Sequence, residues 1–144
     1  SEQGLTFLLC FFLMHVVEGL SLSFVFLLGH LVEVTHSYEY SPEDRAVDHS
    51  WAEHQLRTTA NFGIGSRTLN FLCGGLNFQI EHHLFPNICH VHYPSISRIV
   101  QQTAAEYGLP YHCYPSLSSS LGSHFRFLRQ MGIPADEAGR VKFG

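Results

Sequence analysis

The sequence has few charged residues and no cluster of basic ones. Lysine, arginine, aspartate and glutamate together make up 14% of the 144 residues, and the formal net charge is -4 with histidine neutral. A nucleic-acid-binding domain needs a concentrated positive field that neutralises phosphates, and this chain has none. Nucleic acid is therefore excluded as an expected partner.

The four cysteines lack the spacing of a disulfide framework or a zinc ribbon. There is no CxxC pair, and Cys10 lies inside an apolar run. A reducing compartment suits such isolated thiols. The abundant residue is histidine, with eleven copies against eight lysines and arginines together. Because imidazole is the commonest metal ligand in proteins, this composition raises a metal-binding hypothesis.

A long apolar run, "LTFLLCFFLMHVVEGLSLSFVFLLGHLVEV", occupies residues 5–34. As one helix it would be about 45 Å long against a hydrocarbon core of about 30 Å, with Glu18 at mid-depth. We therefore predict that Leu5–Met14 ends one membrane span, that His15–Gly19 forms a turn, and that roughly Val16–Val34 is the last span. Every lysine and arginine follows this run, which favours a cytoplasmic location for the rest of the chain.

Start signals predict three further helices. A serine three residues before a glutamate is typical of a capping box, and proline suits the first turn of a helix. These signals and the spacing of apolar residues predict helices that begin at Trp51, begin near Pro94, and lie within residues 117–131. The expected fold is all-α, with a transmembrane part in residues 1–34 and a cytoplasmic helical region in residues 35–144.

The stretch "NFQIEHHLFPN", residues 77–87, combines two adjacent histidines with a glutamine three positions earlier. On an α-helix Gln79, His82 and His83 share an arc of about 100°, whereas Glu81 points to the opposite side. Two imidazoles that diverge in this way cannot easily bind the same ion, but each can bind one of two neighbouring ions. The motif thus predicts a dinuclear metal site, although an isolated histidine pair is more often a surface feature.

The surrounding residues carry a family resemblance. "GGLNFQIEHHLFP", residues 74–86, closely resembles the third histidine box of membrane fatty-acid desaturases, in the front-end (delta-5/delta-6-like) group whose box reads Q-x-x-H-H. "WAEHQLRTTANF", "NICHVHYPSIS" and "EYGLPYH" are similar to the same group's C-terminal region, most like bacterial members. The two earlier histidine boxes and the H-P-G-G motif of a cytochrome b5 domain are not in this sequence. A C-terminal fragment that is inactive by itself is therefore expected.

The resemblance implies an oxygen-dependent enzyme with two iron ions that introduces a cis double bond into a fatty-acyl chain, carried as acyl-CoA or acyl-lipid. It also implies electrons from cytochrome b5 or ferredoxin, and a metal site on the cytoplasmic side of the bacterial inner membrane or the endoplasmic reticulum. An unactivated methylene requires a metal-oxygen oxidant. A sister di-iron hydroxylase or acetylenase, or a non-catalytic histidine-rich membrane protein, stays an alternative.

By the same resemblance, His82 and His83 are iron ligands, and Gln79 is a weak or water-mediated ligand or an orienting group. The relatives also carry a histidine on the last span, in a pattern that both His15 and His30 fit loosely. Fifteen helical residues separate these two by about 22 Å, so both cannot serve one cluster. We select His30, which lies nearer the box, and expect His15 at the opposite interface.

The remaining histidines are expected to have lesser roles. His36 and His54 are weaker candidates for the metal site. The Cys-His-x-His spacing of Cys89–His92 is not a usual zinc pattern, so its histidines are expected to serve packing or the polar surface. Surface positions are also expected for His112 and His124.

Overall fold

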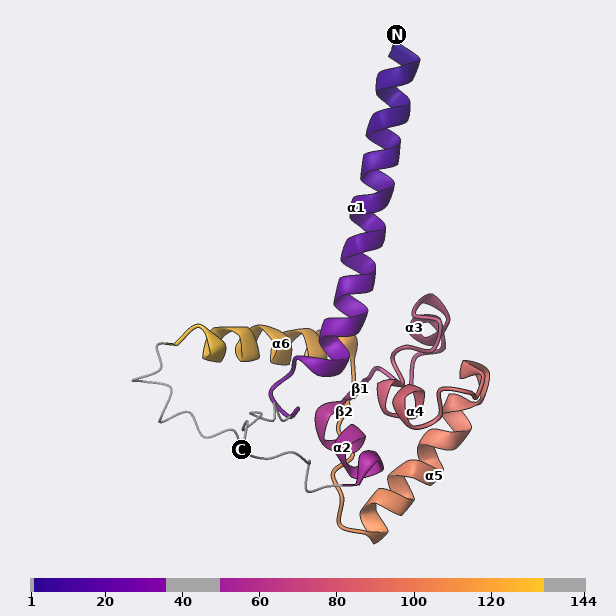
Figure 1. Ribbon diagram of the computed structural model, residues 1–144, viewed down its shortest axis with the longest axis vertical. Helices are drawn as coiled ribbons and strands as arrows, with labels where there is room; N and C mark the ends of the chain where they lie inside the picture. Colours follow the sequence, from indigo (N-terminus) through magenta and orange to yellow (C-terminus); the bar gives the residue numbers. More distant parts are fainter. Residues whose placement is uncertain (1, 36–49, 134–144) are drawn as a thin grey trace.

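The computed structural model describes residues 2–35 and 50–133. These residues are mostly helical, which confirms the predicted all-α class, and Figure 1 shows one long helix standing on a cluster of shorter ones. In chain order the elements are α1 (Glu2–His30), α2 (Trp51–Thr58), β1 (Asn61–Phe62), α3 (Arg67–Leu72), α4 (Gln79–Leu84), η1 (His90–His92), α5 (Tyr93–Glu106), β2 (Cys113–Tyr114) and α6 (Leu117–Met131).

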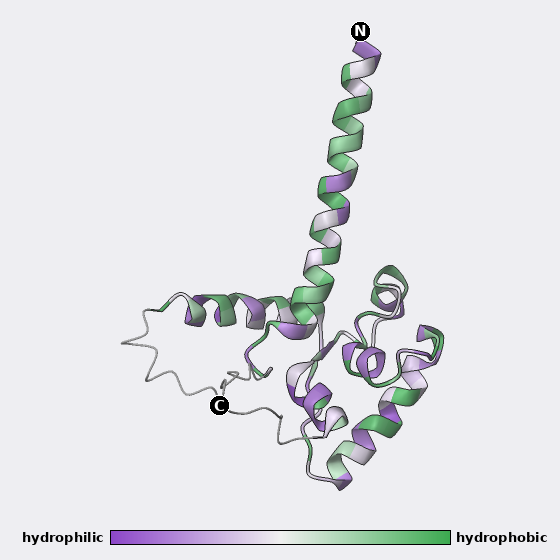
Figure 2. Cartoon of the chain, in the orientation of Figure 1, coloured by the Kyte–Doolittle hydropathy of each residue, from purple (hydrophilic) through white to green (hydrophobic). Residues whose placement is uncertain are grey.

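The long helix α1 is continuous over 29 residues, so the predicted turn at His15–Gly19, with one span ending before it and the last span after it, is wrong. A break in apolar surroundings would leave several backbone groups without hydrogen bonds, at a cost of several kcal/mol each. Glu18 instead has a partner one turn earlier, with its Oε2 3.4 Å from His15 Nδ1. Among the described residues, α1 is the one helix long and apolar enough to cross a membrane (Figure 2).

Helices α2, α4 and α5 pack around a small apolar core. Leu56, Ile80, Val100 and Ala104 form its buried centre. The predicted helix starts are confirmed, since α2 begins at Trp51, α5 has proline in its first turn, and α6 spans residues 117–131. This cluster supports α4, which carries the histidine pair.

Two very short strands, which the sequence analysis did not predict, link the helices. β1 and β2 pair in parallel, with Asn61 opposite Cys113 and Phe62 opposite Tyr114. Phe62 is fully buried, and its backbone N–H donates to the carbonyl of Asn77 just before α4. The pairing therefore places the Asn61 side chain beside α4.

Helix α6 crosses the end of α1 (Figure 1). His124, which was expected on the surface, is buried there, and its Nδ1 lies 2.7 Å from the carbonyl oxygen of Leu31. The expectation was wrong because the carbonyl groups at the end of α1 need hydrogen-bond partners, and α6 brings an imidazole to one of them.

Candidate metal centre

The centre of the site is α4, the six-residue helix Gln79–Leu84. It follows Gly74 and Gly75, which both adopt positive φ, and it ends before Pro86, as predicted. Ile80 points into the apolar core and is completely buried. Burial of Ile80 fixes which sides of α4 its polar residues occupy.

On one side, Glu81 lies in a closed hydrogen-bond network. Asn61 Nδ2 donates to Oε2 at 2.8 Å, and the Tyr111 hydroxyl donates to Oε1 at 2.9 Å. Asn61 also accepts a bond from the backbone N–H of Ile80 at 2.9 Å. Burial raises the pKa of Glu81, and the bonds from Asn61 and Tyr111 oppose that rise. Glu81 is therefore turned away from the histidines, as the helical spacing predicts.

On the other side, His83 meets His30 at the end of α1. Their Nε2 atoms lie 3.2 Å apart, and the ring centroids are 4.9 Å apart at an interplanar angle of 73°. A backbone hydrogen bond with Thr58 orients the His30 imidazole. Two nitrogen ligands that each lie about 2.1 Å from one metal ion, at an angle near that of a tetrahedral or octahedral site, are separated by about 3.0 to 3.4 Å. The His30–His83 pair fits this requirement.

His83 is in the protonation state that metal binding requires. Burial, followed by the nearby imidazoles of His30 and His82, lowers the pKa of His83 to about 4. The ring is therefore neutral at pH 7, and a neutral imidazole is the form that ligates a metal.

His82 points along a different direction from its neighbour. Its ring is 5.7 Å from that of His83, at an interplanar angle of 89°, and its Nδ1 lies 3.4 Å from the Tyr93 hydroxyl. The two adjacent imidazoles thus diverge as the helical spacing predicts. Whether each serves a separate ion stays a prediction.

Gln79 supplies a buried amide that lacks a partner. Its side chain is 1% exposed, and neither Oε1 nor Nε2 has a hydrogen-bond partner within the described ranges. An unsatisfied buried polar group costs about 1–3 kcal/mol, so such an amide indicates a missing partner. The side chain packs on Gly29, where a Cβ atom would lie 2.4 Å from Gln79 Cγ.

Three of the other candidate histidines are exposed. His15 is exposed and sits half the length of α1 away, His90 and His92 are exposed as expected, and His36 lies outside the described residues. His54 is half-buried on α2, and its role stays a prediction. In residues 2–35 and 50–133, no group of three or more histidine, cysteine, aspartate or glutamate side chains is arranged to hold a metal ion. What these ranges bring together is the pair of imidazoles of His30 and His83.

Several residues of the site were not predicted. Gly29, Asn61, Tyr93 and Tyr111 act through contacts between distant segments, which helical periodicity does not reveal. Asn77 is a partial exception because it belongs to the quoted motif. Its side chain is fully buried, and both amide atoms lack a partner among the described residues.

The end of the span-length helix α1 thus meets the histidine pair of α4, as the resemblance to membrane desaturases implies. The family described as fatty acid desaturase matches residues 3–115 of the chain. The chain therefore belongs to the fatty acid desaturase family.

Individual relatives agree with this assignment. The chain is 41% identical to an sn-1 linoleoyl-lipid 6-desaturase of Synechocystis over 82% of its own length and 33% of the relative. It is 40% identical to an acyl-lipid (8-3)-desaturase of Physcomitrium patens, over 92% of the chain and 27% of the relative. A probable Delta(5) fatty acid desaturase C of Dictyostelium discoideum is 36% identical, over 85% of the chain and 28% of the relative. The chain thus spans between about a quarter and a third of the length of these relatives. No solved structure matches it.

Proposed function

We propose that the complete protein containing this chain is an acyl desaturase that introduces a cis double bond into a fatty-acyl chain. One hydrogen leaves each of two adjacent methylenes, two electrons come from a donor protein and two protons from water, and O₂ is reduced to two waters. Cytochrome b5 or ferredoxin is the proposed donor, and acyl-CoA or acyl-lipid the proposed substrate. The reaction takes place at a metal site on the cytoplasmic side of the membrane that α1 crosses.

In this proposal His30 and His83 are ligands of the same iron ion, and His82 is a ligand of a second one. Gln79 is a weak or water-mediated ligand, or its amide orients another ligand. When bound, the iron pair supplies the oxygen chemistry needed at an unactivated methylene. The chain's own residues hold and orient that pair: the Thr58 backbone fixes the His30 ring, and Tyr93 contacts His82.

The observation that carries the proposal is the 3.2 Å separation of the His30 and His83 Nε2 atoms, in a chain of the desaturase family. These residues are 53 positions apart in the sequence, and both rings are partly buried. The unpartnered amide of Gln79 in the same place supports a site that binds something further.

The test is product analysis in yeast that expresses the complete protein, by gas chromatography and mass spectrometry of total fatty acids. The expected result is a fatty acid with one additional cis double bond that is absent from an empty-vector strain. A hydroxylated product without a new double bond would instead support a hydroxylase. Purified protein with zinc or without any metal would exclude both enzymes.

A further inference from the structure

We propose that α6 is an interfacial helix that lies on the surface of the bilayer, beside the end of α1, and inserts Phe125, Leu128 and Met131 among the lipid chains. The proposal rests on α1 crossing the membrane, which is part of the proposed function. It adds a second, peripheral contact between the desaturase chain and lipid.

Polar contacts hold α6 firmly against the end of α1. His124 Nδ1 lies 2.7 Å from the Leu31 carbonyl oxygen, and the backbone N–H of Glu33 donates to Ser123 Oγ at 3.1 Å. Both α6 side chains are buried. Because α1 is exposed along almost its whole length and becomes buried at Leu28, α6 sits where the apolar stretch of α1 ends.

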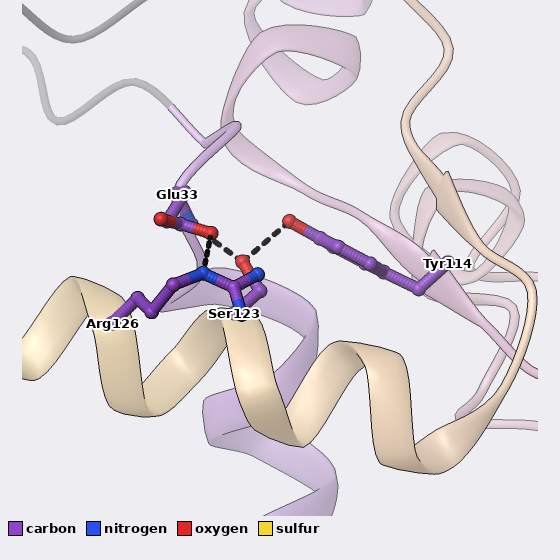
Figure 3. A network of polar contacts seen from close by, with 4 residues as sticks. All are labelled: Glu33, Tyr114, Ser123 and Arg126. Carbon is purple, nitrogen blue, oxygen red and sulfur yellow. Dashed lines mark hydrogen bonds and ion pairs between the residues drawn. The ribbon is translucent and has the colours of Figure 1, made fainter.

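The direction of the polar side of α6 is fixed by a network that Figure 3 shows. Arg126 Nε donates to Glu33 Oε2 at 2.8 Å, and the Tyr114 hydroxyl lies 2.6 Å from Ser123 Oγ. In Figure 3 these four side chains lie on one side of α6, and α1 extends from the other side. The polar network is thus on the side of α6 that faces away from the proposed membrane.

The opposite side of α6 carries an exposed apolar stripe. At 100° per residue the side chains of Leu117, Leu128 and Phe125 fall within about 80°, and Met131 extends this arc to about 120°. Phe125 is 60% exposed, Leu128 46% and Met131 62%. Arg129, also exposed, lies at the edge of this stripe, where its guanidinium can reach lipid phosphates. This is the residue distribution of an interfacial helix.

The elements around this apolar stripe favour lipid as the molecule that covers it. The last turns of α1 before this crossing also expose large apolar side chains, such as Phe24 and Phe26. Figure 1 shows α6 running across the end of α1, so a bilayer that α1 crosses has its surface parallel to α6. On the other side of α1, α3 also reaches toward this level and exposes Phe71 and Leu72.

The experiment is site-directed spin labelling of the complete protein in phosphatidylcholine nanodiscs. Single cysteines replace Phe125, Leu128 or Gln130 in a background in which all native cysteines, including the four of this chain, are replaced and iron content is retained. Collision with O₂, which partitions into lipid, and with a water-soluble nickel chelate is then measured. Gln130 is the matched control because it lies about 160° from Leu128 on the same helix.

We expect labels at 125 and 128 to be several-fold more accessible to O₂ than to nickel, and the label at 130 to show the reverse preference. Equal nickel access at all three positions would overturn the proposal, and so would protection from both reagents, which indicates a protein contact. A label at Leu13 on α1 distinguishes failure of the proposed α6 placement from failure of the proposed membrane span. If that label is in lipid while those on α6 are not, only the placement of α6 fails, whereas nickel access at Leu13 contradicts the proposed membrane span itself.

Discussion

The two sides of α4 carry buried polar groups in opposite states. On one side the Glu81 carboxylate receives hydrogen bonds from Asn61 and Tyr111 on both of its oxygens. On the other side the Gln79 amide has no partner within the described part of the chain, and the His83 Nε2 faces only another imidazole nitrogen. Since buried polar groups are normally satisfied, the first side contributes to the stability of the helix, and the second supports the proposed metal site, where a ligand would complete it.

The largest effect on activity is expected from the loss of an imidazole on the ligand side of α4, which is the side that carries Gln79 and His83. His30→Ala or His83→Ala should lower desaturase activity of the complete protein by more than about 100-fold, because even partners outside the ligand shell contribute 10- to 100-fold. The measurement is the amount of new unsaturated fatty acid in yeast, normalised to protein level. His92→Ala, exposed on η1, is the matched control and should stay within about twofold.

A smaller effect is expected from a methyl group between α1 and the ligand side. A Cβ at Gly29 would lie 2.4 Å from Gln79 Cγ, so Gly29→Ala should displace the glutamine and lower activity about 10- to 100-fold. Gly19→Ala is the control in the same helix, because nothing lies within 4 Å of a Cβ there. If Gly29→Ala behaves like Gly19→Ala in the yeast assay, the close approach of α1 to Gln79 is not needed for function.

The smallest effect is expected from a substitution of Glu81, on the side of α4 whose polar groups all have hydrogen-bond partners. Glu81→Gln keeps the shape but replaces one acceptor oxygen with a donor, so a bond from Asn61 or Tyr111 is lost and the free energy of unfolding should fall by about 1–3 kcal/mol. Thermal unfolding of the purified protein measures this, with the exposed Glu106→Gln as control. Iron content should change little in either variant. Loss of iron from Glu81→Gln without loss of stability would instead make Glu81 a ligand and remove the contrast between the two sides.

The sequence predicted the parts of this comparison that depend on local spacing. The arc that Gln79 and His83 share, the opposite direction of Glu81 and the end of α4 before Pro86 all follow from helical periodicity and from proline. The choice of His30 over His15 relied on family resemblance and on the length of a helix. Neither source could supply the close approach of Gly29 or the bonds from Asn61, because these contacts join segments that are far apart in the chain.

Two errors have a common physical origin. The break in α1 was predicted because Glu18 is costly to place in an apolar helix. The contact of Glu18 with His15 reduces that cost, and a break would leave backbone groups unsatisfied at a larger cost. The surface position expected for His124 overlooked the carbonyl of Leu31 as an acceptor at the end of α1. In both cases the need of backbone groups for hydrogen-bond partners decided the local structure.

The central claim is that His30 and His83 are ligands of the same iron ion. Iron per chain, measured by inductively coupled plasma mass spectrometry on the complete protein, tests it most directly in His30→Ala, His83→Ala and the double variant, with His92→Ala as reference. We expect both single variants to lose iron to the same extent, and the double variant to lose no more than either one. A His30→Ala protein that keeps the iron content of the His92→Ala reference, or losses that add in the double variant, would contradict the claim.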